Sequence, residues 1–198
     1  MKNVEEKKMD PTESLTLISS MINTAKNKLA DDGFLLIFWG WLVFSASMIH
    51  YCCIVAEINY GHLVWPILMP IGGIVSMMYG YKQSKKETVK TYVDTYLGYL
   101  WAAFGIGLFM TLIFMQPHGI KATYFFLMLL YGMATFISGG LLNFKPLIYG
   151  SLFSFAFASV AHFVGEKEQL LCISAALLAS YIIPGHLLRS QYKSQLHV

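Results

Sequence analysis

The chain has 198 residues, of which 56% are hydrophobic and only 13% are charged, and its formal net charge is +3. A soluble domain is normally about 25% charged, so the composition argues against a water-soluble fold. The cations lie between long apolar runs rather than in one basic patch, so membrane topology explains them better than nucleic-acid binding does, and no nucleic acid is expected as a partner.

The N-terminal segment, residues 1–32, is predicted to contain one amphipathic helix that ends near Asp31. Asp10 can cap this helix, Pro11 suits its first position, and Glu13 completes a capping box. Apolar residues then recur at spacings of three and four, as along one face of a helix: Leu15, Ile18, Ile22, Ala25 and Leu29. Two placements remain open. The helix lies flat on the inner leaflet with its lysines near the headgroups, or its apolar face docks on another protein or on the helical bundle.

Six apolar runs follow, over residues 33–56, 63–81, 95–115, 122–142, 146–164 and 169–188. Each covers the ~30 Å hydrocarbon core at ~1.5 Å per residue, the shorter ones barely. Only Asn143, Phe144 and Lys145 separate the fourth run from the fifth, which predicts a tight helical hairpin. The expected fold class is all-α: a polytopic membrane protein with six transmembrane helices arranged as three hairpins, plus the N-terminal amphipathic helix at the interface.

Lysine and arginine are unevenly distributed between the loops. All but two of the 14 precede the first run or follow the second, fourth and sixth runs; the exceptions are Lys121 and Lys167. Because short cytoplasmic loops carry the excess of these residues, both termini are predicted to be cytoplasmic. The predicted divisions are a cytoplasmic segment (1–32), a transmembrane domain (33–188) and a cytoplasmic tail (189–198).

Small residues recur at helical spacing in three of the runs, and such stripes let helices approach closely in lipid. They are predicted to be packing surfaces rather than a substrate path. The stripes are Gly98, Ala102 and Gly105 in the third run; Ser151, Ser154, Ala158 and Ala161 in the fifth; and Cys172, Ala176 and Ala179 in the sixth.

Interruptions in the runs are candidate functional positions, because broken helices with free backbone groups can build solute sites near the bilayer midplane. Kinks or helix ends are the structural explanation of the same residues. The region Pro70–Gly73 is the best candidate for a functional break. The candidate polar or hinge positions of this kind are Pro70, Gly72, Gly73, Gly139, Gly140, Asn143, Pro184 and His186.

Histidine and cysteine gather on the side opposite the termini. His50 and His162 lie near the outer ends of the first and fifth runs, and all three cysteines are on that side. Imidazole, thiol and carboxylate together are what a transition-metal site needs, but no pair has a ligand spacing on one helix. A metal or pH-sensing site is the alternative to solvated interfacial histidines, and no cofactor is predicted. No motif of a hydrolase, nucleotide-binding enzyme or zinc protease occurs, so no enzymatic activity is predicted.

Three stretches, Gly33–Ser47 (GFLLIFWGWLVFSAS), Thr135–Gly150 (TFISGGLLNFKPLIYG) and Ser180–Leu188 (SYIIPGHLL), resemble a group of uncharacterised bacterial six-helix membrane proteins. The resemblance extends over nearly the whole chain and implies a protein of the bacterial inner (cytoplasmic) membrane, without implying an activity. The three-hairpin layout is also faintly similar to that of the acid-resistance membrane protein family.

The leading functional hypothesis is a non-enzymatic scaffold, sensor or regulatory subunit. It would act through residues 10–30 on a second copy of the chain or on another membrane or cytoplasmic protein. The alternative is a small transporter or channel subunit for an apolar or weakly polar solute. That alternative requires a cavity that reaches the midplane beside Pro70–Gly73.

Overall fold

The computed structural model describes residues 10–31, 33–85 and 92–196. This part of the chain is all-helical and without strands, which confirms the expected all-α class, while the six-span arrangement stays a prediction. A 3-10 turn, η1 (Gly61–Leu63), precedes α3, and a π-helical segment, η2 (Leu178–Ile182), joins α7 to α8 in one continuous helix. The α-helices are α1 (Pro11–Asp31), α2 (Gly33–Val55), α3 (Val64–Ser84), α4 (Tyr92–Ile113), α5 (Met115–Leu141), α6 (Lys145–Ala161), α7 (Glu166–Leu177) and α8 (Ile183–Leu196).

Five helical spans in the described part are long and apolar enough to cross a membrane: Gly33–Val55, Gly61–Gln83, Tyr92–Ile113, Ala122–Leu141 and Glu166–Ser190. They are compatible with a multi-pass membrane protein. The fifth predicted run, 146–164, forms the apolar but shorter helix α6, which has 17 residues. The last helix continues to Leu196, so most of the segment expected to be a tail is helical.

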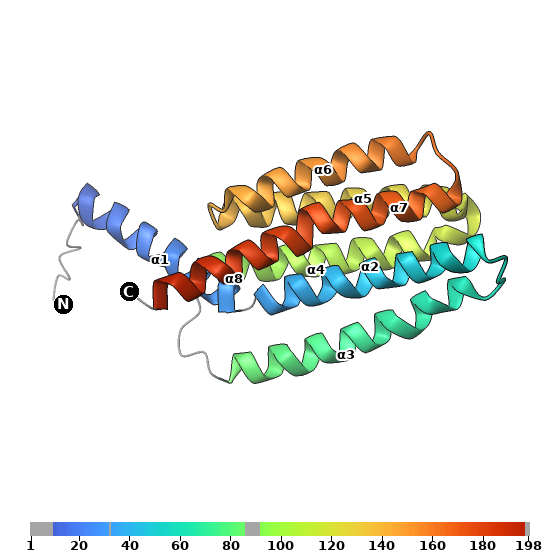
Figure 1. Ribbon diagram of the computed structural model, residues 1–198. Helices are drawn as coiled ribbons and strands as arrows, with labels where there is room; N and C mark the ends of the chain where they lie inside the picture. Colours follow the sequence, from blue (N-terminus) through green and yellow to red (C-terminus); the bar gives the residue numbers. More distant parts are fainter. Residues whose placement is uncertain (1–9, 32, 86–91, 197–198) are drawn as a thin grey trace, which may run out of the picture.

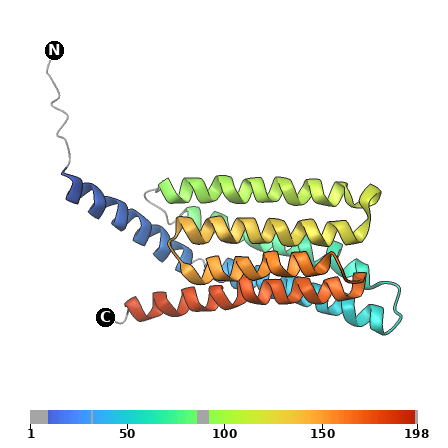
Figure 2. The ribbon, with the colours of Figure 1, turned by 90° about the horizontal axis from the view of Figure 1, so that it is seen from above.

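The helices run side by side in a bundle with an inner and an outer set (Figures 1 and 2). In the inner set, α5 packs on α6, and the continuous helix α7–η2–α8 packs on both α2 and α6. In the outer set, α3 contacts α2, and α4 contacts α5 and α1. Burial follows this division: 39–61% of the apolar window is buried in α2, α5 and α7–α8, against 6% in α3 and in α4.

The predicted tight hairpin is present between α5 and α6. Asn143 has a left-handed backbone (φ 49°), and the Phe144 N–H donates to the Gly139 carbonyl at 2.9 Å. The Asn143 N–H donates to the Gly140 carbonyl at 3.1 Å, which completes a Schellman motif. Gly139 is needed because a Cβ there would lie 2.8 Å from Ile148 Cγ1 of α6. These residues therefore turn the chain.

The small-residue stripe of the fifth run packs as predicted. All four of its residues, Ser151, Ser154, Ala158 and Ala161, are fully buried on α6. The stripe of the third run does not pack within this chain. Its members on α4 are exposed, and a Cβ on Gly98 or Gly105 would meet nothing within 4 Å. The spacing of small residues shows that they lie on one face of a helix. It does not show whether that face packs inside the bundle.

The π-helical segment lies directly before Pro184. Proline has no N–H for the carbonyl four residues earlier, and its ring clashes with that carbonyl, so the preceding turn widens. The Ser180 hydroxyl donates to the Ala176 carbonyl at 2.7 Å within this region. Gly150 of α6 lies against the widened turn, where a Cβ would meet the Ala179 carbonyl oxygen and would lie 2.9 Å from Ser180 Cα.

Figure 1 places α1, the end of α3, the start of α6 and the end of α8 at one end of the bundle. The described cations of these elements include Lys82 and Lys85 at the end of α3, Lys145 at the start of α6 and Arg189 on α8. Some residues behind the sequence predictions lie outside the described part: Lys2, Lys7, Lys8, Asp32, Lys86 and Lys90.

Candidate functional site

Helix α1 begins at Pro11, as predicted. The Ser14 N–H donates to the Asp10 carbonyl at 3.0 Å, and the Thr12 hydroxyl donates to the Asp10 carboxylate. Neither bond is the predicted cap, in which a side-chain oxygen of Asp10 accepts from a backbone N–H. Further along, Thr16 Oγ1 donates to the Thr12 carbonyl at 2.8 Å and Ser20 Oγ to the Leu17 carbonyl at 2.7 Å. Three hydroxyl groups of α1 thus have local partners, and its large apolar side chains are the candidates for contact with a partner.

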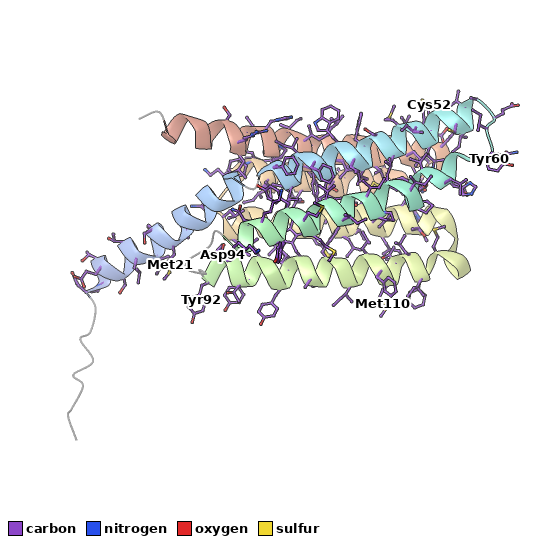
Figure 3. All side chains as sticks on the ribbon, turned by 90° about the horizontal axis from the view of Figure 1, so that it is seen from below. Met21, Cys52, Tyr60, Tyr92, Asp94 and Met110 are labelled. Carbon is purple, nitrogen blue, oxygen red and sulfur yellow. The ribbon has the colours of Figure 1, made fainter. Side chains whose placement is uncertain are left out.

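Those apolar side chains are exposed. Leu15 is 65% exposed, Leu17 45% and Ile18 53%. The helix contacts α8, α4 and α2, while its first half extends beyond the end of the bundle (Figures 1 and 2). Figure 3 labels Met21 close to the point where α1 leaves the bundle. The exposed members of the predicted apolar stripe, Leu15 and Ile18, therefore form a surface on an arm, here called the α1 surface, whereas Leu17 is exposed on another side of the helix.

His50 forms the second candidate site, at the opposite end of the bundle. Its imidazole, 9% exposed, lies between α2, α3 and α5. The Trp65 indole Nε1–H donates to His50 Nδ1 at 3.1 Å, and the Tyr124 hydroxyl lies 3.4 Å from the same nitrogen. Gly61 closes the site, because a Cβ there would lie 2.9 Å from His50 Cδ2 and 2.6 Å from Cys53 Cβ.

The two outer histidines have different surroundings. His162 is exposed, and its ring contacts Phe125 (centroids 6.3 Å apart) and Phe163 (5.2 Å) rather than the residues around His50. In the described part of the chain, no three side chains of His, Cys, Asp or Glu come together as a metal site would require. Trp65 and Tyr124 were not among the candidate residues predicted from the sequence. The available signal was the indole N–H of Trp65, which needs a hydrogen-bond acceptor when it is buried.

The Pro70–Gly73 region lies on the outer helix α3. Helix α3 is continuous through Pro70, and a Cβ on Gly72 would lie 3.0 Å from Cη2 of Trp39, whereas Gly73 has nothing within 4 Å. The Trp39 indole also donates to Ser76 Oγ at 2.8 Å. The absence of a side chain at Gly72 therefore leaves space for the Trp39 ring between α2 and α3.

The other candidate hinge positions are spread over the bundle. Gly140 is at the end of α5 with nothing within 4 Å of a Cβ, and Asn143 belongs to the α5–α6 turn. Pro184 is buried at the start of α8, and His186 is exposed on α8 near the end that carries α1. The structure does not bring these residues to the Pro70–Gly73 region.

The inner helices also bury polar groups that hold them together. Ser154 Oγ of α6 donates to the Met128 carbonyl of α5 at 3.1 Å, and Gln169 Nε2 donates to the Ala161 carbonyl at 2.7 Å. The hydroxyl of Tyr181, in η2, has no hydrogen-bond partner among the described residues, and this residue is 2% exposed. The Tyr181 ring lies 5.5 Å from Tyr131 and 6.5 Å from Trp101, centroid to centroid.

Comparisons of the chain with protein-family models, with curated proteins and with solved structures found no match. The class is therefore set by the fold: a helical bundle with several helices apolar enough to cross a membrane. The resemblance to bacterial six-helix membrane proteins stays a prediction.

Proposed function

We propose that this protein is a non-enzymatic scaffold or regulatory subunit of the bacterial inner membrane and that it recruits a protein partner through the α1 surface. The observation that carries the proposal is the exposure of Leu15 and Ile18, two neighbours on one face of a helix that extends beyond the bundle. Large apolar side chains that are grouped in this way usually mark an interaction site.

The proposed topology has six spans with both termini in the cytoplasm. Helix α6 is the shortest, at about 26 Å for its 17 residues, and a bilayer thins locally around a short span at modest cost. It packs between α5 and the continuous helix α7–η2–α8, both of which contain a span long enough to cross. The excess of Lys and Arg at the end that carries α1 supports a cytoplasmic location for that end.

Charge favours a protein rather than a lipid surface as the contact of α1. From Asp10 to Thr24 the only charged residues are Asp10 and Glu13, both acidic, and the first cation is Lys26. An interfacial helix on anionic lipid carries Lys or Arg on its polar face, and the arm lacks them. Its apolar residues also repeat at alternating spacings of three and four, which suits helix pairing.

Site-specific photo-crosslinking in intact cells tests the proposal. A photoreactive residue at Ile18 should give a discrete protein adduct, and the same residue at Ser20 should not. Adding Leu15→Asp should abolish the adduct while membrane insertion is retained, because only the arm is altered. Deleting residues 1–30 should likewise abolish association without loss of insertion. Adducts with lipid alone, or none, would contradict the proposal and favour the alternative placement of α1 on the inner leaflet.

The alternative function, transport of a weakly polar solute, retains one supporting observation. The Tyr181 hydroxyl is buried without a partner beside a π-helical turn, and such turns often occur at functional sites. Pro70–Gly73 adds no support, because α3 is an outer helix. Uptake of a weakly polar solute into proteoliposomes that is lost in Tyr181→Phe would favour this alternative.

A further inference from the structure

Helix α3 is attached to the bundle mainly along one neighbour. It packs on α2 and η1 and is among the least buried spans. Two indole hydrogen bonds fasten it to α2. Near its start, Trp65 Nε1 donates to His50 Nδ1 at 3.1 Å; further along, the Trp39 indole of α2 donates to Ser76 Oγ at 2.8 Å. Of these two bonds, only the first has a titratable acceptor.

The protonation state of His50 follows from its partner. An indole N–H is a donor only, and a neutral imidazole has one donor and one acceptor nitrogen. His50 Nδ1 must therefore be unprotonated in this structure, with the ring proton on Nε2. Protonation makes both ring nitrogens donors, so the Trp65 N–H would face a second N–H and the hydrogen bond would be lost.

We propose that the Trp65–His50 hydrogen bond is an acid-sensitive latch, which holds the start of α3 on the bundle at neutral pH and releases it when His50 takes up a proton. The Trp39–Ser76 bond does not titrate, so the far end of α3 stays attached and the helix pivots there. This inference is independent of the function proposed for α1. Its geometry places the latch at the end of the bundle away from α1, which is the end where the loop between α2 and α3 lies (Figure 1).

Other titratable groups surround His50, and the test has to separate them from it. His62, on η1, acts on the imidazole electrostatically, and Cys53, on α2, packs beside it against Gly61. The Tyr124 hydroxyl of α5 approaches the same ring nitrogen, and Glu166, at the start of α7, acts electrostatically on Tyr124. Histidine is the one of these residue types whose ordinary titration falls between about pH 5 and pH 8, so His62 is the necessary control.

The experiment measures the position of α3 in the full-length protein in lipid nanodiscs. The native cysteines are replaced by alanine, and spin labels are placed at two pairs of exposed positions, Ile67 with Phe126 near the latch and Met78 with Ile137 near the other end. Electron–electron distances are recorded at about pH 8 and about pH 5. Nitrogen-15 spectra of labelled histidine report the protonation of His50 in the same samples.

At the lower pH the Ile67–Phe126 pair should gain a second, longer distance population, while the Met78–Ile137 pair stays unchanged. The midpoint of this change should coincide with protonation of His50. His50→Gln, which keeps an acceptor but does not titrate, should remove the pH response. Trp65→Phe should show the longer population at both pH values, and His62→Gln and His162→Gln should respond as the parent does.

Three results would overturn the latch. The first is an unchanged Ile67–Phe126 distance while the His50 ring protonates. The second is a His50 ring that stays neutral down to about pH 5. The third is a pH response that disappears in His62→Gln or His162→Gln but persists in His50→Gln. The first two are measured on the parent sequence of the label-bearing protein, so they do not depend on whether the Trp65 variant folds.

Discussion

Ser47 of α2 and Ser174 of α7 lie with their hydroxyl oxygens 2.6 Å apart in the buried interface between the two helices. Each hydroxyl also has a carbonyl of its own helix within reach, that of Phe44 at 3.0 Å and that of Leu170 at 2.9 Å. Either serine therefore keeps an acceptor when the other is removed. The pair lies at a defined register of α2 against α7, and removing one of its hydroxyls should change the free energy of unfolding only slightly.

Replacing either serine of this pair by alanine should lower the free energy of unfolding by about 0.6 kcal/mol, and by no more than about 1.7 kcal/mol. The reason is that interhelical hydrogen bonds in lipid are partly replaced by others in the unfolded reference state. Reversible unfolding in mixed micelles measures this loss. Ser159→Ala, on the exposed side of α6 with a bond to its own helix, is the control and should have no effect. A loss above about 3 kcal/mol would mean that the surviving hydroxyl is left unsatisfied.

Gly150→Ala should destabilise the bundle. The added Cβ would overlap the Ala179 carbonyl oxygen and would lie 2.9 Å from Ser180 Cα, so α6 has to move away from η2. Overpacking of this kind costs on the order of 1–3 kcal/mol. Gly105→Ala on α4 makes the same chemical change where nothing lies within 4 Å, and it should be neutral or slightly stabilising. Equal unfolding midpoints for the two variants would contradict the close contact of α6 with η2.

Tyr181→Phe should leave stability unchanged or raise it by about 1 kcal/mol or more, because the change removes a buried hydroxyl that has no partner. Tyr181→Leu should be destabilising, because it also removes the ring contacts with Tyr131 and Trp101. Thermal unfolding in detergent measures both variants. Tyr149→Phe, at an exposed position, is the neutral reference. A clear loss in Tyr181→Phe alone would show that the hydroxyl binds a group such as water.

The proposed orientation predicts which positions an impermeant thiol reagent reaches. In a protein whose native cysteines are replaced by alanine, Tyr60→Cys should be labelled from outside the cell, because residue 60 is exposed in the loop between α2 and α3 (Figure 3). Ser190→Cys, exposed near the end of α8, should be labelled only after the membrane is opened. The reverse pattern would invert the topology.

Helix positions were predictable from the sequence because the bilayer demands a length and an apolar composition, and the six runs 33–56, 63–81, 95–115, 122–142, 146–164 and 169–188 all became helices. The turn at Asn143 was predictable because a connection of three residues, 143–145, between two apolar runs is too short for anything but a tight turn. The helical arrangement was not: α3 and α4 are outer helices, and the apolar character of their sequences is the same as that of the inner ones. A helix that faces lipid and a helix that faces protein both need apolar side chains, so composition does not separate outer helices from inner ones.

The His50 site was predicted only in part. The sequence placed His50 near a helix end and favoured a solvated histidine, with a metal or pH-sensing site as the alternative, whereas the structure buries it beside Trp65 and Tyr124. Tyr124 is 74 residues away along the chain, and no local period links such positions. The widened turn at Leu178–Ile182 was also missed. Pro184 was predicted to interrupt a helix. Whether the turn before a proline widens or kinks depends on the helices that pack against that turn.

Helix α2 has a consequence for how the protein is made. Its close neighbours include η2, since a Cβ on Gly40 would lie 2.7 Å from Ile182 Cγ1 and 3.1 Å from Tyr181 Cβ, and α8, since a Cβ on Gly185 would lie 2.9 Å from Ile37 Cγ1. The side of α2 that carries Gly40 is therefore covered by segments that are synthesised much later. Until residue 182 has been made, this side lies in the bilayer without its native neighbours. Packing of α2 consequently has to wait for η2, and nascent chains that stop before residue 178 are expected to be the preferred substrates of membrane quality-control proteases.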